Sequence, residues 1–306
     1  MNRPSSSLSI MPRPSVFRRL GVTPLINARG VYTELGGSIL APEVWDAMTE
    51  INAWFVSISD LLDRTGKLIA ELVGAEAARV VPGAAAGVAL GVGACMTGTD
   101  GSKMEPLPDT SGMRNRVLVQ HNHLSQYRYA RCASLTGAQL VAVGDAGGTG
   151  SGQLAEAIDG RTAAVLIPAH LDGADHTVVL SKVCAIAHAG GVPVVVDAAY
   201  MNFPPARMGT FTKQGADLVC FSAKYFLGTE CRRVCLWTSG SGAGGRRHRL
   251  HGVRIGTLPD LRPTAKDGPA YDHCDVPRTR AMVRDGPRRP PRHVCSAGER
   301  ARSCVG

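Results

Sequence analysis

The stretches VVVDAAY (194–200) and ADLVCFSAKYF (216–226) contain the two residues that decide the fold. In the first stretch a run of valines leads to Asp197, and in the second the apolar run LVCF is followed three residues later by Lys224. Such runs are typical of strands buried on both faces of a parallel sheet, and ligands of these sheets bind at the carboxyl ends of the strands. The two stretches therefore predict a ligand site around Asp197 and Lys224.

The chemistry of this pair indicates pyridoxal phosphate. Lys224 follows Asp197 by 27 residues, just past a second apolar strand. A lysine amine in this place forms a Schiff base with the cofactor's aldehyde, and the aspartate keeps the pyridine nitrogen protonated so that the ring accepts electrons. Each residue alone is more often a loop lysine or a turn aspartate, so the prediction that both are catalytic depends on the pair.

A third element lies upstream, in VVPGAAAGVALGVGACM (80–96). After an expected strand end at 80–81, Gly83, Ala84 and Ala85 carry no bulky side chains, so their backbone amides can approach an anion where the next helix begins. The alternative is a helix of small residues packed closely in a core. The order of phosphate loop, aspartate and lysine along the chain favours the cofactor site.

An ordered set of segments spanning roughly residues 20–228 resembles the selenocysteine synthase group of fold-type-I pyridoxal-phosphate enzymes. This group includes seryl-tRNA selenium transferase and the D-glucosaminate-6-phosphate ammonia-lyase type. The segments are INARGVYTELGGS (26–38), VGAEAARVVPGAAAG (73–87), VLVQHNHLSQY (117–127), GAQLVAVG (137–144), PVVVDAAY (193–200) and GADLVCFSAKYF (215–226).

The resemblance implies roles for individual residues. Lys224 is implied to be the Schiff-base lysine and Asp197 the partner of the pyridine nitrogen. The implied phosphate ligands are Ser222, through its hydroxyl, and the loop residues Gly83, Ala84 and Ala85. His123 is implied to lie near the cofactor ring, although Leu124 stands where an arginine often follows this histidine.

The resemblance also bears on the reaction. The chain has ELGG (34–37) where the selenium transferases tend to have NLGR, and it shows no counterpart of their additional N-terminal region. We therefore expect β-elimination or ammonia loss from an amino acid or amino-sugar acid. The alternatives are selenium transfer onto L-seryl-tRNA(Sec), and a non-catalytic fragment or basic nucleic-acid-binding protein. The family further implies a homodimer or higher homo-oligomer.

The rest of the large domain reads as an α/β fold with a mainly parallel sheet covered on both faces. The expected strands are 117–119, 139–143, 163–168, 193–197 and 217–221, and the expected helices are 42–54, 60–73, 84–96, 152–159 and 178–190. No uninterrupted apolar span reaches about 20 residues, and residues 1–20 form a leader without a secretory apolar core. We expect a cytoplasmic enzyme with a small-molecule substrate, no membrane span and no metal.

Four further signals lie outside these motifs. Arg29 could bind a substrate carboxylate or phosphate, or form a structural ion pair. His170 and Asp172 follow an expected strand and could face the substrate or be ordinary loop residues. His188 is expected to be a core or surface residue of its helix. The glycine-rich stretch GDAGGTGSG (144–152) lacks the spacing of a nucleotide loop and predicts a flexible connection.

The last quarter of the chain differs in composition. Residues 231–306 contain 16 Lys and Arg against six Asp and Glu, whereas residues 1–230 contain 18 against 19. Arg-Pro clusters and weak hydrophobic periodicity are typical of disorder. Nucleic-acid binding is disfavoured because no aromatic residues are interleaved with the charges. A zinc site is disfavoured because the spacing of Cys231, Cys235, His248 and His251 is one residue short at its end.

A shifted reading frame explains this tail better. Reading the codons after residue 228 one base further on permits family-like sequence over several consecutive segments. We therefore expect three parts: a flexible leader (1–20), a cofactor-binding large domain (21–228) and a frameshifted, disordered basic tail (229–306). The family's small C-terminal domain would then be lost. The nucleotide sequence around codon 228 decides between the two frames.

Overall fold

A computed structural model describes residues 15–201 and 205–225 of the chain. Of the two compact units, Met1–Asp260 and Leu261–Gly306, the second lies wholly outside the described residues. The predicted frameshifted tail, its zinc pattern and the lost small domain also lie outside them. Helix α1 (Ser15–Leu20) falls within the segment predicted as a leader. The boundaries of the three parts remain predictions.

Five strands form one parallel sheet, as the sequence predicted. They are β1 (Arg116–Gln120), β2 (Gln139–Val143), β3 (Thr162–Pro168), β4 (Val194–Asp197) and β5 (Leu218–Cys220). Their order is β2-β1-β3-β4-β5, and every neighbouring pair is parallel. In such a doubly wound order, ligands bind outside the carboxyl ends of the strands.

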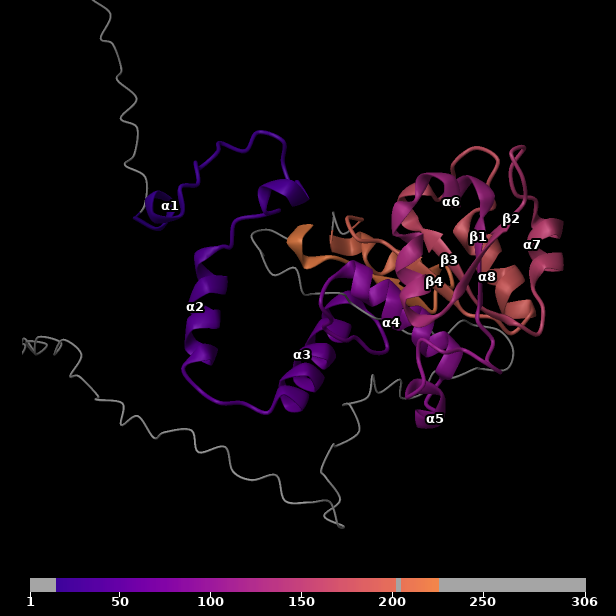
Figure 1. Ribbon diagram of the computed structural model, residues 1–306, viewed down its shortest axis with the longest axis horizontal. Helices are drawn as coiled ribbons and strands as arrows, with labels where there is room; N and C mark the ends of the chain where they lie inside the picture. Colours follow the sequence, from indigo (N-terminus) through magenta and orange to yellow (C-terminus); the bar gives the residue numbers. More distant parts are fainter. Residues whose placement is uncertain (1–14, 202–204, 226–306) are drawn as a thin grey trace, which may run out of the picture. The chain divides into compact units, whose positions relative to one another are not determined.

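The helices connect and cover these strands (Figure 1). The α-helices after α1 are α2 (Pro42–Asn52), α3 (Ile58–Val73), α4 (Ala84–Thr97), α5 (Gly101–Met104), α6 (His121–Gln126), α7 (Ser151–Ala157), α8 (Leu180–Ala189) and α9 (Thr210–Lys213). The 3-10 helices are η1 (Thr33–Leu35), η2 (Arg128–Thr136), η3 (Ala169–Leu171), η4 (Pro205–Arg207) and η5 (Ala223–Tyr225).

The predicted helices are confirmed, whereas the strand end expected at 80–81 is wrong. Residues 80–81 lie in irregular backbone that pairs with no strand of the described chain. Two local features explain the difference. Pro82 has no N–H to donate to a strand neighbour, and the Gly83 N–H instead donates to the Val81 carbonyl at 2.7 Å. The loop therefore turns directly into α4.

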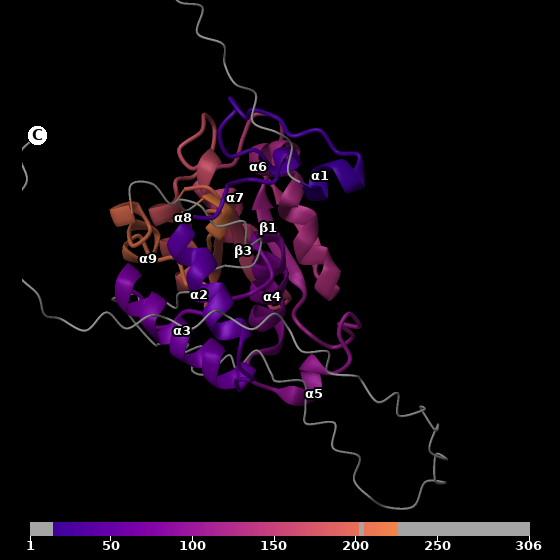
Figure 2. The same cartoon turned by 90° about the vertical axis from the view of Figure 1, so that its left-hand side faces the viewer.

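The alternation of side chains along the strands builds two apolar layers. Helices lie on both sides of the sheet (Figures 1 and 2). Along β4, Val194 and Val196 pack with residues of α7, α8 and α9, whereas Val195 packs with residues of α4 and η2 on the opposite face. Successive side chains of a strand point to opposite faces. Both faces of the sheet are therefore covered, which explains why its strands read as continuous apolar runs.

Four cysteines lie in the described part of the large domain. Cys132, Cys184 and Cys220 are buried, Cys95 is half-buried, and none of the four forms a disulfide there. None of the helices in residues 15–201 and 205–225 combines the length and the apolar character that a membrane span requires.

A histidine–aspartate pair joins α8 to the start of β5. The Nε2 atom of His188 lies 2.8 Å from Oδ2 of Asp217, and the same oxygen accepts the Val194 N–H at 2.7 Å. His188, left open as a core or surface residue, is thus half-buried and paired. The hydrogen bond to Asp217 raises the pKa of His188.

This pair predicts a pH-dependent contribution to stability. Because the folded pKa of His188 is raised, its contribution should be fully present below the unfolded pKa of about 6.5 and should be lost as pH rises through the folded pKa. Urea unfolding at a series of pH values should therefore show that His188→Gln destabilises the protein more at low pH than at high pH. In an Asp217→Asn background this pH dependence should disappear. An effect of His188→Gln that does not vary with pH would contradict the pairing.

Candidate functional site

Most of the residues that the sequence predicts for the cofactor site lie at the carboxyl edge of the sheet. His123 lies in α6 directly after β1, and Asp197 is the last residue of β4. Beyond β5, the Ser222 N–H donates to the Ala199 carbonyl at 2.9 Å. The segments that follow β4 and β5 therefore stay paired past the strands, and Lys224 follows in η5.

Asp197 is a buried carboxyl group with two hydrogen-bond donors. Only 6% of the residue is exposed. Its Oδ1 accepts the Ala199 N–H at 3.0 Å, and its Oδ2 accepts the hydroxyl of Tyr127. Burial raises the pKa of Asp197, and the two hydrogen bonds act in the opposite direction. The carboxyl group is thus held in a fixed orientation in a place where a positively charged partner would stabilise it.

Lys224 is held by a turn from the N-terminal part of the chain. The Ser38 hydroxyl donates to the Lys224 carbonyl at 2.5 Å, and the Lys224 amine donates to Oγ1 of Thr33. A bridge between Tyr32 and Gly37 closes this turn around η1. Neither Thr33 nor Ser38 was predicted from the sequence. The available signal was the pair Gly36-Gly37, since both glycines adopt a φ of 91°.

His123 is a buried, neutral imidazole. Its Nε2 lies 3.1 Å from the Leu171 carbonyl, while its buried Nδ1 has no hydrogen-bond partner among the described residues. Burial lowers the pKa of His123. Because the carbonyl requires a donor, Nε2 carries the proton and Nδ1 presents a lone pair. An unpartnered buried nitrogen of this kind is a common feature of functional sites.

A row of rings runs from Asp197 towards Lys224. His170 lies 6.0 Å from Tyr127 and 5.3 Å from Tyr200, and Tyr200 lies 6.0 Å from Tyr225, measured between ring centroids. The Lys224 amine lies 4.8 Å from the Tyr225 ring. His170, which could have been an ordinary loop residue, therefore belongs to the aromatic surroundings of the site.

The start of α4 has the character of an anion site. Gly83 is its N-cap, with a φ of 96°, and no side chain caps the helix. The helix packs on β3, β4 and β5. Near its end, Gly93 faces Thr136, which lies three residues before the amino end of β2. The start of α4 therefore points to the carboxyl edge, where its first N–H groups lack helical acceptors.

These features fit pyridoxal phosphate. The amine of Lys224 suits the aldehyde, the buried Asp197 suits a protonated pyridine nitrogen, and the uncapped start of α4 suits a phosphate. Ser222 is buried beside Ala199, as a second phosphate ligand would require. The roles given to Gly83, Ala84, Ala85, Ser222, Asp197, His123 and Lys224 remain predictions.

The remaining candidates are Arg29, Asp172 and the glycine-rich stretch 144–152. Arg29 is exposed, and its guanidinium lies 4.2 Å from the centroid of the Tyr32 ring, with no ion pair in the described chain. Asp172 accepts the Leu180 N–H at 2.7 Å and so fixes the start of α8. The stretch 144–152, expected to be a flexible connection, contains a turn closed by mutual backbone hydrogen bonds between Asp145 and Gly148, and its last two residues begin α7.

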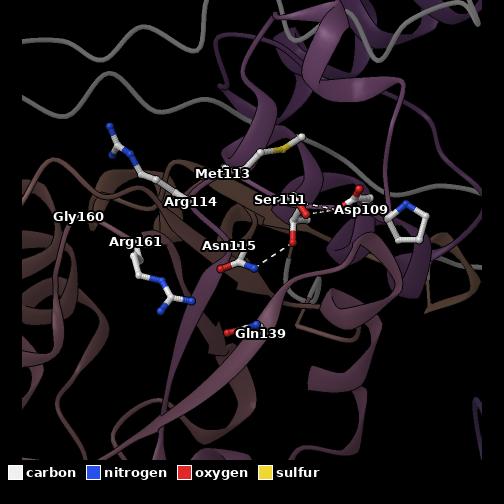
Figure 3. A pocket seen from close by; sticks show the side chains of 11 residues that line it. Asp109, Ser111, Met113, Arg114, Asn115, Gln139, Gly160 and Arg161 are labelled. Carbon is white, nitrogen blue, oxygen red and sulfur yellow. Dashed lines mark hydrogen bonds between the residues drawn. The ribbon is translucent and has the colours of Figure 1, made fainter.

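A polar pocket of about 660 Å³ lies at the opposite edge of the sheet (Figure 3). Asn115, Gln139 and Arg161, which line it, adjoin the amino ends of β1, β2 and β3. It contains none of the predicted site residues and is not the cofactor site. Within residues 15–201 and 205–225, no cluster of three or more His, Cys, Asp or Glu could hold a metal ion.

The chain is similar in sequence to two curated proteins. No model of a known protein family matches the chain. The 5'-C-glycyluridine monooxygenase-decarboxylase of a Streptomyces species is 36% identical over 217 residues, which are 69% of this chain and 53% of that protein. The D-glucosaminate-6-phosphate ammonia lyase of Salmonella typhimurium is 33% identical over 217 residues, which are 70% of this chain and 58% of that protein.

A solved structure of D-glucosaminate-6-phosphate ammonia-lyase is also similar. The TM-score is 0.66 at 31% identity, with 74% of this chain and 61% of that chain covered. The chain spans little more than half the length of the two curated relatives. Together with the parallel fold, these similarities support a relationship to the fold-type-I family of pyridoxal-phosphate-dependent enzymes. Pyridoxal phosphate is its expected cofactor.

The two glycines that flank α4 provide a test of the phosphate loop. Gly83 and Gly98 have φ values of 96° and 59°, so alanine at either position should cost about 1–3 kcal/mol of stability. Only Gly83→Ala should also weaken pyridoxal-phosphate binding, by about tenfold or more, because only the start of α4 is expected to meet the phosphate. Titration of each folded variant with the cofactor measures this difference. Equal affinities in the two variants would contradict the predicted loop.

Proposed function

We propose that the protein is a pyridoxal-phosphate enzyme of the ammonia-lyase type, acting on an α-amino acid. The observation that carries the proposal is the placement of Asp197 and Lys224 beyond adjacent parallel strands, with the start of α4 directed to the same edge. A similarity of 33% identity to an ammonia lyase supports it. Because the chain spans only part of that relative, the activity itself is a proposal.

Each residue of the site has a separate role in this reaction. Pyridoxal phosphate, when bound, withdraws electrons from the α-carbon of an amino acid. The Nζ atom of Lys224 would hold the aldehyde of the cofactor, and the same amine is placed to accept a proton from the α-carbon of the substrate. Thr33 orients this amine through Oγ1. Asp197 would keep the pyridine nitrogen protonated, and the neutral His123 would lie near the ring.

The remaining polar groups bind anionic parts of the ligands. The backbone amides at Gly83, Ala84 and Ala85 and the Ser222 hydroxyl would hold the phosphate of the cofactor. Arg29, which is exposed and bears no ion pair in the described chain, binds the carboxylate of the substrate.

The names of the two curated relatives support a substrate class. One acts on D-glucosaminate 6-phosphate, and the other bears the name of a glycyl-substituted uridine. Both compounds join an amino acid to a hydroxylated, sugar-derived side chain. We propose a substrate of this class, an amino-sugar acid in the simplest case. A second candidate reaction is decarboxylation at the same carbon, which the relative of 36% identity favours.

Replacing the lysine tests the cofactor chemistry. Wild-type protein mixed with pyridoxal phosphate should develop visible absorbance, and borohydride reduction should attach the cofactor to the peptide that contains Lys224. Lys224→Ala should lose both signals because no other amine occupies this place. The exposed Lys213, in α9, serves as the matched control, and Lys213→Ala should behave as wild type. If Lys224→Ala keeps the reduced adduct, the proposed site is wrong.

The products separate the two reactions. With an amino-sugar acid as substrate, an ammonia lyase releases ammonia and leaves a keto acid, whereas a decarboxylase releases carbon dioxide and leaves an amine. Measurement of ammonia and carbon dioxide in the same reaction distinguishes them, and Lys224→Ala should release neither.

Exposed apolar side chains support a homo-oligomer. Ile26 and Phe55 are fully exposed, Trp54 is 76% exposed, and α2 has no buried residue. Exposed apolar groups gathered in one segment are typical of a protein interface. We propose that a second copy of the chain covers this segment. Sedimentation should show a dimer or larger species for wild type and a smaller one for Phe55→Ser. A monomeric wild type at micromolar concentration would contradict this proposal.

A further inference from the structure

Tyr127 is a buried residue that the reaction described above does not use. It directly follows α6, and only 3% of it is exposed. Its hydroxyl donates to Oδ2 of Asp197, which lies 70 residues further along the chain. The other carboxyl oxygen of Asp197 accepts the Ala199 N–H at 3.0 Å. Each oxygen of this carboxyl group therefore has one donor from the protein.

The hydroxyl of Tyr127 is a permanent donor. Burial, followed by the negative charge of Asp197, raises the pKa of Tyr127 well above its ordinary value. The phenol therefore keeps its proton near neutral pH. A phenylalanine would fill the same space in the apolar layer around α4 without offering a donor. The hydroxyl thus has a purpose beyond packing.

We propose that Tyr127 is a positioning residue, which fixes the plane of the Asp197 carboxylate and keeps it ionised opposite the pyridine nitrogen of the cofactor. A carboxylate has about four lone-pair positions. Tyr127 and Ala199 occupy one position on each oxygen, and the remaining positions are free to accept the pyridine N–H. This inference rests on the proposed use of pyridoxal phosphate.

The other groups that face this pair carry no lasting charge near neutral pH. Burial lowers the pKa of His170 and raises that of Cys132, so both are neutral. Tyr200 also faces Asp197, and burial raises its pKa. Cys220 faces Tyr127. With no cation among these described neighbours, hydrogen bonds are what offset the burial of the carboxylate, and Tyr127 is the one side chain that donates such a bond in the described site.

The first measurement uses the protein without cofactor. Carbon-13 NMR of protein labelled at the aspartate carboxyl groups follows the titration of Asp197, whose signal is identified by its absence in Asp197→Asn. Loss of a hydrogen bond to a charged group should make Asp197 about 10 to 100 times weaker as an acid in Tyr127→Phe. Tyr129 is exposed and its ring lies 6.4 Å from that of Tyr127, so Tyr129→Phe is the matched control and should leave the titration unchanged.

The second measurement uses the cofactor-loaded protein. Nitrogen-15 NMR of labelled pyridoxal phosphate reports whether the pyridine nitrogen carries a proton. In Tyr127→Phe the cofactor should still attach to Lys224, but its pyridine signal should shift towards the neutral form because the weakened carboxylate takes the proton. In an Asp197→Asn background, Tyr127→Phe should have no further effect on this signal.

The outcomes separate this inference from the proposed function. Attachment through Lys224 together with an unchanged Asp197 titration in Tyr127→Phe overturns the inference and leaves the function standing. If the wild-type protein does not bind the cofactor, both the inference and the proposed function are overturned. The Asp197 titration then still measures the contact between Tyr127 and Asp197. If Tyr127→Phe does not fold, 3-fluorotyrosine at position 127 replaces it. Its more acidic phenol is a stronger donor and should make Asp197 a stronger acid, and no change would overturn the inference.

Discussion

The parallel pairing of β4 with β5 is the constraint on which the site depends. Asp197 lies opposite Cys220 in this pairing, and the Ala198 N–H donates to the Cys220 carbonyl at 2.9 Å. A shift of one residue would turn every side chain of a strand to the other face. Two strands buried on both faces resist such a shift because apolar contacts on either side would be lost. Core packing thus sets the distance between Asp197 and the segment that contains Lys224.

The site also concentrates polar groups that the fold must accommodate. Burying an ionised carboxyl group at the end of a strand costs free energy unless hydrogen-bond donors surround it. At Asp197 these donors come from three places, since Ala199 and Tyr127 already bind it and the cofactor would supply the third. His123 keeps an unpartnered nitrogen, and the start of α4 keeps uncapped N–H groups. Such unsatisfied groups lower stability unless a ligand binds them, which links cofactor binding to stability.

Much of this arrangement could be predicted from residue patterns. The five strands agree with their expected ranges to within one residue at each end. Short continuous apolar runs are typical of strands that are buried on both faces, so their position in the sequence predicts the strand. The expected strand at 80–81 was wrong because apolar character alone cannot reveal a missing partner strand. Thr33, Ser38 and Tyr127 were missed because their contacts join positions 191, 186 and 70 residues apart.

The sequence by itself determined the class of protein, because the order of a small-residue helix start, a strand-end aspartate and a later lysine reflects chemistry that needs those side chains. It also determined the layers of the sheet, because alternation along a strand is local. Only the tertiary structure decided which groups meet Asp197 and Lys224. The residues next to Tyr127 or Thr33 in the sequence do not reveal the hydrogen-bond partner of its hydroxyl. That partner depends on how distant segments pack together.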